Sequence, residues 1–314
     1  MTLDPRVRRL VKLANRLERH DPSKSMPERR AASLAMAKRG RWLVMPSGPA
    51  MASERDLEVP VAGGKIVVRL YVPPGGGPLP LHVFLHGGGW CVGSLLERDP
   101  RCRQIASGAR CAVASVDYRL APENAFPTAA EDCYAALSWL VDHARELGFD
   151  ASRVSVGGES AGANLAAAVC LMARDRQGPA LCFQWLDVPA VDSTMSQPTI
   201  HSVPDGYLLD MAVLLEFRGC YLPDDADYTH PYASPLLADS HEGLPPAWIM
   251  SCEYDKLRSD GEAYAAALEA AGVPVQFQIL AGHVHPSFAF TRVVPSAKRY
   301  EQEAIAALSA ALHA

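Results

Sequence analysis

From residue 56 onward, short β-branched apolar runs alternate with longer stretches in which apolar residues recur at helical spacing. This alternation is typical of the α/β class, in which a mostly parallel sheet carries helices on both faces. The runs predict eight strands, at residues 57–61, 65–72, 81–85, 112–117, 154–157, 182–187, 247–252 and 275–280. The Ala62-Gly63-Gly64 connection suits a hairpin, so we expect the sheet to begin antiparallel and to continue parallel.

Two helices are predicted ahead of the first strand. In the first of them one helical face carries the apolar residues Val7, Leu10, Val11, Ala14 and Leu17. Ser25 and Glu28 form a capping-box pattern before the second helix, which Gly40 is expected to end. Residues 1–42 hold 12 Lys or Arg and 4 Asp or Glu, so this segment carries +8 and the remainder −13. The helix pair either packs on the main body as a cap or lies on an anionic membrane; the lack of a bulky aromatic residue before residue 41 favours the cap.

The stretch 189–238 interrupts the alternation of strands and helices. It is rich in Pro, Asp and Tyr, with one amphipathic helix predicted near residues 208–217. A last helix is predicted over residues 287–312. We therefore expect N-terminal cap helices at 1–50, a core at 51–188 and 239–314, and a cap insertion at 189–238 between the two parts of the core.

Composition narrows the class of protein. A chain of 314 residues that is 49% hydrophobic can bury a large core, yet no apolar run approaches the roughly 18 to 20 residues of a membrane-spanning helix. The first ten residues are too charged for a signal peptide. The eight cysteines never occur as C-x-x-C, so we expect buried thiols and a cytoplasmic protein. The net charge of −5 argues against a nucleic-acid partner.

One motif indicates a nucleophile. Gly158-Glu159-Ser160-Ala161-Gly162 lies between a predicted strand and a helical stretch. In that context G-x-S-x-G is typical of a nucleophile elbow, a strained turn that lifts the serine hydroxyl above the end of the strand. The glycines allow strand and helix to pass closely. A serine that only caps the helix is the alternative, and the placement of the motif favours Ser160 as a nucleophile.

A second motif indicates an oxyanion site. His86-Gly87-Gly88-Gly89-Trp90 directly follows the third predicted strand. Three consecutive glycines leave backbone N–H groups open to a substrate, as acyl transfer requires. The N–H of Ala161, at the start of the helix after Ser160, is the further donor expected. A glycine loop that is merely flexible is the alternative.

A serine nucleophile needs a base and an acid that orients the base. Asp255 follows the seventh predicted strand and His285 the eighth, which gives the chain order Ser, Asp, His. Rival residues are Glu253 and Asp260 for the acid and His283 for the base. Asp255 is favoured because Glu253 abuts the strand and Asp260 is expected to cap the next helix. The two histidines also fit a metal pair, but no carboxylate or cysteine cluster completes a coordination shell.

These motifs, in this order, resemble the hormone-sensitive-lipase-like branch (bacterial family IV) of the α/β-hydrolases, which includes many bacterial carboxylesterases. The likeness covers most of the chain and rests on residues 86–89, 117–123, 126–127, 158–162, 233–236, 244–247, 253–261 and 282–285. It implies the α/β-hydrolase fold with a helical cap and these roles: nucleophile Ser160, base His285, acid Asp255, and oxyanion donors Gly88, Gly89 and Ala161. Asp117, Arg119 and Glu123 are interpreted as a structural anchor beside the site.

The implied activity is hydrolysis of carboxylic esters with short to medium acyl groups through an acyl-enzyme, with no cofactor and no metal. The substrate is expected to contact Trp90, Tyr207, Leu208, Met211 and Phe217. Two alternatives stay open: hydrolysis of lactones, amides or carbamates by the same residues, and a ligand-binding relative without activity. We expect a small-molecule ester as partner and no stable membrane insertion. The sequence does not choose between a monomer and a homodimer.

Overall fold

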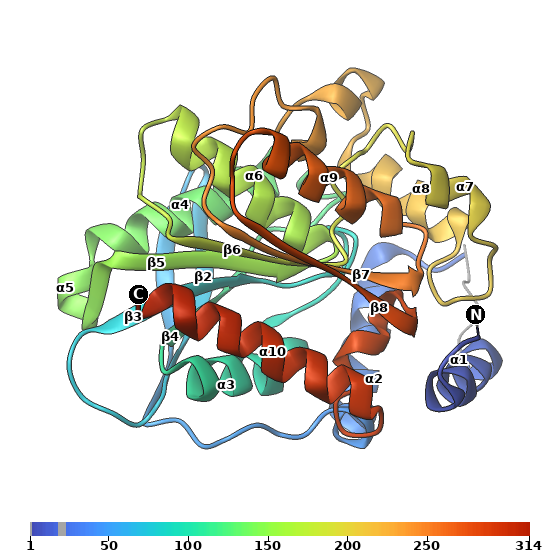
Figure 1. The fold of residues 1–314 in the computed structure, drawn as a ribbon, viewed down its shortest axis with the longest axis horizontal. Helices are drawn as coiled ribbons and strands as arrows, with labels where there is room; N and C mark the ends of the chain where they lie inside the picture. The colour runs from blue at the N-terminus through green and yellow to red at the C-terminus, as the bar shows by residue number, and fades with distance from the viewer. Residues whose placement is uncertain (1, 18–22) are drawn as a thin grey trace.

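The computed structural model describes residues 2–17 and 23–314 (Figure 1). Its centre is an eight-stranded sheet with the strand order β1-β2-β4-β3-β5-β6-β7-β8. The strands are β1 (Ser53–Val61), β2 (Gly64–Val72), β3 (Leu79–Leu85), β4 (Ala112–Asp117), β5 (Phe149–Glu159), β6 (Phe183–Asp187), β7 (Ala247–Tyr254) and β8 (Val275–Val284). The pairs β1–β2 and β2–β4 are antiparallel and the other pairs are parallel. The eight predicted strands and the change of direction are confirmed.

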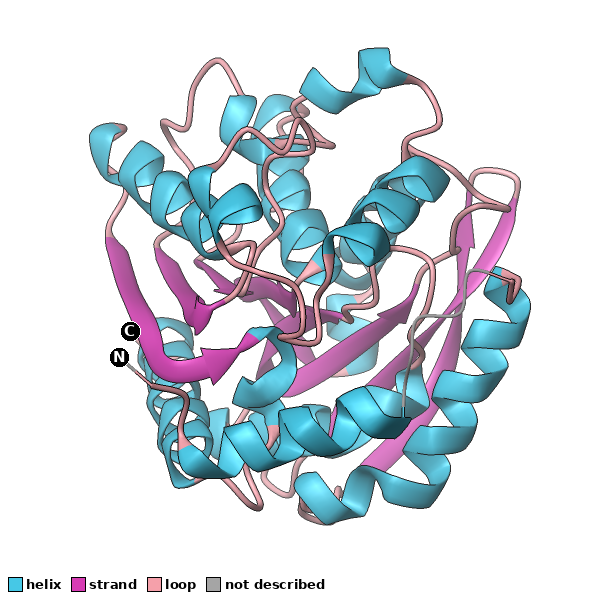
Figure 2. Cartoon of the chain, turned by 90° about the vertical axis from the view of Figure 1, so that its right-hand side faces the viewer, coloured by secondary structure: helices cyan, strands magenta, loops and turns pink. Residues whose placement is uncertain are grey.

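Helices cover both faces of the sheet (Figures 1 and 2). One face carries α4 (Thr128–Asp142), the short α5 (Ala144–Leu147), α6 (Ala161–Asp175) and α9 (Arg258–Ala270), and the other carries α3 (Leu95–Ala109) and α10 (Pro295–Leu312). Two apolar cores result. Because side chains alternate along a strand, Leu85 of β3 enters the first core and Phe84 enters the second. Strands buried on both faces need nearly continuous apolar sequence, which is the pattern that predicted them.

The last helix begins later than predicted. It starts at Pro295 rather than at residue 287, after the 3₁₀ turn η3 (His285–Ala289). The apolar residues that extended the helical pattern, among them Phe288 and Val294, are buried from this turn and the loop after it. Proline at the first helical position fixes the true start.

Two helices precede the sheet, as predicted: α1 (Pro5–Leu17) and α2 (Met26–Val44). Val7 and Val11 of α1 are buried against Val284 at the end of β8, whereas the side chain of Leu17 lies outside the described residues. The backbone N–H and the hydroxyl of Ser25 donate to Glu28 at 2.8 and 2.7 Å, which closes the start of α2.

Gly40 does not end α2, so that expectation was wrong. A glycine in a helix costs about 1 kcal/mol relative to alanine, but it stops the helix only where other groups satisfy the last carbonyls. Here such groups meet the carbonyls of residues two and four positions after Gly40. Arg292 donates from its side chain to the carbonyl of Trp42 and from its backbone to that of Val44, both at 2.9 Å.

The insertion contains α7 (Pro198–Ser202), α8 (Met211–Tyr221) and two 3₁₀ turns, η1 (Asp225–Thr229) and η2 (Pro235–Leu237). Figure 1 shows α7 and α8 beyond the tips of β7 and β8, on the side where α1 lies. Asn15 of α1 donates to the carbonyl of Gly206 at 2.9 Å, so the two additions to the core meet. No helix of the described residues combines the length and the apolar character needed to cross a bilayer.

Candidate active site

Ser160 lies in the sharp turn between β5 and α6. Its backbone has φ +56° and ψ −120°, a conformation that costs energy for any residue with a side chain. Its N–H donates to the carbonyl of Asp187 at 2.8 Å, and its carbonyl accepts from Asn164 at 3.0 Å. These two bonds hold the turn between β6 and α6.

The two glycines of the motif permit this turn, as expected. A Cβ at Gly162 would overlap the carbonyl oxygen of Leu85, and one at Gly158 would lie 2.5 Å from the same oxygen. The end of β3 therefore passes directly against the turn. This contact places the glycine loop that follows β3 beside Ser160.

A chain of two hydrogen bonds joins Ser160 to the ends of β7 and β8. His285 Nε2 lies 2.9 Å from Ser160 Oγ, and His285 Nδ1 lies 2.7 Å from Asp255 Oδ2. The Asp255 side chain is fully buried, and its other oxygen accepts from the N–H of Leu257 at 3.0 Å. An ionised carboxylate can only accept, so Nδ1 carries the proton and Nε2 is free to accept from the serine hydroxyl.

The rival residues are engaged elsewhere. Glu253 accepts from the N–H of Gly282 at 2.7 Å. Asp260 lies inside the first turn of α9 rather than at its cap, and it accepts from two N–H groups of the insertion, at residues 191 and 192. His283 contacts the hydroxyls of two serines, at 287 and 296, both at 2.8 Å. Within the described ranges, no three His, Cys, Asp or Glu side chains are grouped so as to hold a metal ion.

A second serine–histidine pair lies inside the sheet. His82 Nδ1 is 2.9 Å from Ser155 Oγ, and both residues have no exposed surface. Burial lowers the pKa of His82 to about 3. This neutral, enclosed pair is out of reach of a substrate, so Ser160 is the better candidate for chemistry.

A ring stack and several hydrogen bonds hold the loop after β3. His86 stacks on Tyr118 with ring centres 4.3 Å apart, and the Tyr118 hydroxyl donates to the carbonyl of His86 at 2.7 Å. The carbonyl of Gly88 accepts from the N–H groups of Cys91 and Val92 at 3.1 and 3.0 Å. The carbonyl of Gly88 is thus turned into the loop.

Two of the predicted substrate-contacting residues lie at this loop. The ring of Phe217, from α8, occupies the place where a Cβ of Gly89 would project. Trp90 is buried and stacks on Tyr221, with ring centres 4.6 Å apart and planes 6° apart. The helix α8 therefore covers the glycine loop from the insertion.

The other three lie at the turn before α8. Tyr207 and Leu208 are half-buried and pack with α1 and with Val284, the neighbour of His285. Met211 begins α8, and its N–H donates to Asp205 at 3.0 Å. The five predicted contact residues thus lie in the glycine loop or in the insertion 189–238.

The 117–123 anchor is only partly as interpreted. The guanidinium of Arg119 donates to Asp132 at 2.6 and 2.9 Å, which ties this loop to α4. Glu123 is paired with Arg30 of α2 at 2.6 Å, whereas Asp117 is exposed and joins no ion pair among the described residues. Arg30 was not predicted; it also donates to the carbonyl of Cys91 at 2.6 Å and so links α2 to the glycine loop.

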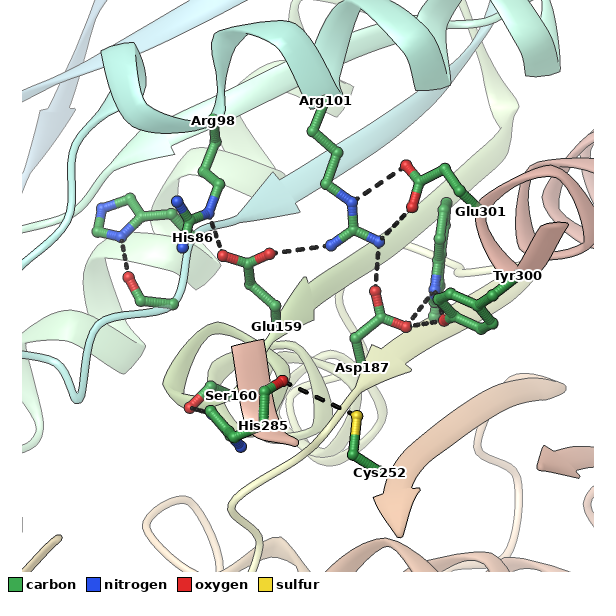
Figure 3. A network of polar contacts seen from close by, with 12 residues as sticks. His86, Arg98, Arg101, Glu159, Ser160, Asp187, Cys252, His285, Tyr300 and Glu301 are labelled. Carbon is green, nitrogen blue, oxygen red and sulfur yellow. Dashed lines mark hydrogen bonds and ion pairs between the residues drawn. The ribbon is translucent and has the colours of Figure 1, made fainter. Parts of the chain in front are cut away.

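A buried cluster behind Ser160 was also missed (Figure 3). Arg101 of α3 donates to Glu159 at 2.9 Å, to Asp187, and to Glu301 at 3.2 Å. Arg98 is a further partner of Glu159. The partners lie up to 200 residues apart in the chain, and no local pattern in the sequence points to them.

Comparison with known proteins identifies relatives that are named as ester hydrolases. A family described as having the alpha/beta hydrolase fold matches residues 82–289. The carboxylic ester hydrolase LipN of Mycobacterium tuberculosis is 44% identical over 247 residues, which are 77% of this chain and 66% of that protein. The carboxylesterase NlhH of the same organism is 43% identical over 253 residues, 79% of each chain. The solved structure of an ester hydrolase from the Lake Arreo metagenome, 35% identical, superimposes over the whole of both chains with a TM-score of 0.93.

Proposed function

The chain belongs to the hormone-sensitive-lipase-like branch of the α/β-hydrolase family, and on this premise we propose that it hydrolyses carboxylic esters with Ser160 as nucleophile. The observation that carries the proposal is the pair of hydrogen bonds, 2.9 and 2.7 Å long, from Ser160 through His285 to Asp255. A serine hydroxyl is a weak nucleophile at neutral pH unless a base is poised to take its proton.

In the proposed reaction, Ser160 Oγ attacks the ester carbonyl while its proton passes to His285 Nε2. The resulting oxyanion accepts from the N–H groups of Gly88, Gly89 and Ala161, the last of which lies at the positive start of α6. Collapse breaks the bond to the alkoxy oxygen, which takes the proton from His285 and leaves as the alcohol. Water, deprotonated by the same histidine, then attacks the acyl-enzyme and releases the acid. Asp255 stabilises the imidazolium formed in each half of the cycle.

We further propose that the substrates are esters with short to medium acyl groups. The N-terminal helices and the insertion 189–238 would act as the cap of the site, with Phe217 against the glycine loop and Tyr207 packed on α1. Such a covered site suits a small molecule better than an open lipid surface. With p-nitrophenyl esters of increasing acyl length, we expect kcat/KM to peak at short or medium chains. A maximum at long chains with activation at a lipid interface would contradict this.

Replacing the nucleophile tests the assignment most directly. We expect Ser160→Ala to lower kcat by on the order of a thousandfold or more, because only binding and oxyanion stabilisation would remain. Ser155→Ala is the matched control, since it removes the hydroxyl of the serine–histidine pair inside the sheet. Near-normal turnover in folded Ser160→Ala would refute the proposal.

A fluorophosphonate probe separates hydrolysis from ligand binding alone. The probe reacts with an activated serine and is expected to label Ser160 stoichiometrically in the wild-type chain. A folded wild-type chain that takes up no label would favour a ligand-binding relative. If Ser160 is labelled, a hydrolysis screen that includes lactones, amides and carbamates would show which of these substrates the enzyme cleaves.

A further inference from the structure

The cluster behind the nucleophile is formed by Arg98, Arg101, Glu159, Asp187 and Glu301. It joins α3, the elbow, the end of β6 and α10, as Figure 3 shows. The side chain of Arg101 is only 3% exposed. Three aromatic rings pack around its guanidinium, with centroids 5.1 to 5.7 Å away. Arg101 is therefore held in an enclosed, largely apolar setting with three carboxylates as its partners.

Arg101 contacts two residues that are each connected to Ser160 through the backbone. Glu159, which accepts from Arg101 Nη1 at 2.9 Å, is the residue directly before Ser160. Asp187, which accepts from Arg101 Nη2, offers its backbone carbonyl to the N–H of Ser160 at 2.8 Å. The guanidinium of Arg101 thus fixes both Glu159, directly before Ser160, and Asp187, which accepts from the backbone N–H of Ser160.

The charges in the cluster keep this arrangement in place. Burial opposes ionisation of Glu159, but Arg98 and Arg101 outweigh it and hold the pKa of Glu159 below its usual value. Burial raises the pKa of Asp187 and of Glu301. The two arginines thus favour the charged form of Glu159, the carboxylate directly before Ser160.

We propose that Arg101 is a positioning residue for the ester hydrolysis proposed above, holding Ser160 in its strained conformation within reach of His285. The planar guanidinium donates to Glu159, Asp187 and Glu301 at the same time through separate N–H groups. A lysine ammonium at the same place would be a single point of charge and could not keep all three contacts in their present geometry. The proposal rests on the function proposed for Ser160.

The test compares Arg101→Lys with Arg103→Lys. Arg103 is the matched control because it lies on the same helix and also forks to carboxylates, Glu54 and Asp99, but these are away from the elbow. Displacement of a reacting group by about 1 Å can cost on the order of a hundredfold in rate. We expect Arg101→Lys to lower kcat roughly 10- to 100-fold with KM changed less than about twofold, and to slow fluorophosphonate labelling in the same proportion. Arg103→Lys should match the wild type in all three.

If Arg101→Lys does not fold, Asp187→Asn decides. It keeps the shape and the backbone carbonyl of residue 187 but removes the anion that Arg101 contacts, and a several-fold lower kcat at unchanged KM is expected. Rates are expressed per phosphonate-reactive site, so a variant that is only less stable would show normal kcat, and this would overturn the proposal. A raised KM with normal kcat would overturn it too. If instead the wild type neither hydrolyses esters nor takes up label, the proposed function itself has failed.

Discussion

At Gly89, two separate constraints exclude a side chain. The backbone has φ +56°, and the ring of Phe217 occupies the position of a Cβ. We expect Gly89→Ala to move the loop and its N–H groups, and to lower kcat by on the order of a hundredfold, as loss of one oxyanion donor does. Steady-state kinetics on a short-chain p-nitrophenyl ester would measure this.

The double variant Gly89→Ala/Phe217→Ala removes the overlap and should recover part of the lost activity. Gly63→Ala is the control: Gly63, in the hairpin of β1 and β2, also has a positive φ, +79°, but the nearest atom to its Cβ would be Arg119 Nη1, 3.8 Å away. It should cost stability and leave kcat unchanged. A Gly89→Ala variant as active as Gly63→Ala would show that the loop does not position the oxyanion donors.

Single residues of the site differed in how well they could be predicted. Ser160, Asp255 and His285 each follow a strand of a parallel sheet, and the carboxyl ends of such strands converge, so their meeting follows from the strand pattern. Arg101 and Arg30 follow no such rule. Each lies on a helix whose polar residues look solvated in the sequence, and its partners come from elements whose packing only the folded chain defines.

At the scale of elements, Lys256 ties the insertion to the loop that bears Asp255. Its side chain is 5% exposed, and Nζ donates to the carbonyl of Val203 at 2.6 Å and pairs with Asp205 at 3.1 Å. Asp205 in turn holds the N–H of Met211, at the start of α8. Lys256 therefore fixes the turn that carries Tyr207 and Leu208.

We expect Lys256→Met to loosen this turn without touching the reacting groups. Lost contacts to the substrate in both ground state and transition state raise KM and spare kcat, and a loss of about 1 kcal/mol corresponds to roughly fivefold. KM and kcat across acyl lengths would measure the effect, with the exposed Lys298→Met as control. A fall in kcat at constant KM would mean that Lys256 acts on Asp255 instead.

Element boundaries were harder to predict than the elements themselves. The helix expected near residues 208–217 is present as α8 but begins at Met211, whose N–H donates to Asp205, while Asp210 accepts from the N–H of Gly206 in the turn before it. At the end of α2 a tertiary partner, Arg292, determines where the helix ends. At the start of α10 the apolar pattern continued through the preceding turn, and Pro295 marks the first helical residue.

At the scale of the whole molecule, three buried histidines couple stability to pH. Burial lowers the pKa of His82 to about 3 and the pKa values of His86 and His283 to about 4, against 6.5 for a free histidine. The unfolded chain therefore takes up protons below pH 6.5 that the folded chain does not. Their stabilising contribution is complete above pH 6.5 and is lost as the pH falls toward 4.

Each such histidine lowers the free energy of unfolding by up to ~1.4 kcal/mol per pH unit in this window, so the three together approach ~4 kcal/mol per unit. Urea unfolding at several pH values between 7 and 4.5 would measure the slope. His82→Asn keeps a polar partner for Ser155 and removes one titrating group. The slope of unfolding free energy against pH should therefore be smaller by the contribution of one histidine, up to ~1.4 kcal/mol per pH unit. An unchanged slope would show that His82 titrates normally.

The fold as a whole was predictable because its strongest signals are periodic and local. Eight apolar runs separated by helices allow few arrangements other than a wound parallel sheet, and the first hairpin fixes where antiparallel pairing occurs. The sequence pattern does not predict how the N-terminal helices and the insertion pack on the core. The contacts of α1 with residues 206–208, and of α2 with the glycine loop, join segments with no common period.

The contact between Arg101 and Glu301 spans 200 residues and has a consequence for biosynthesis. A growing chain exposes Arg101, Glu159 and Asp187 long before α10 emerges to cover them. Until then these charged side chains stay hydrated, and the turn at Ser160 lacks the contacts that depend on Glu301. The segment that carries His285 leaves the ribosome only shortly before α10. The capacity to cleave esters is therefore expected to appear only after α10 has left the ribosome.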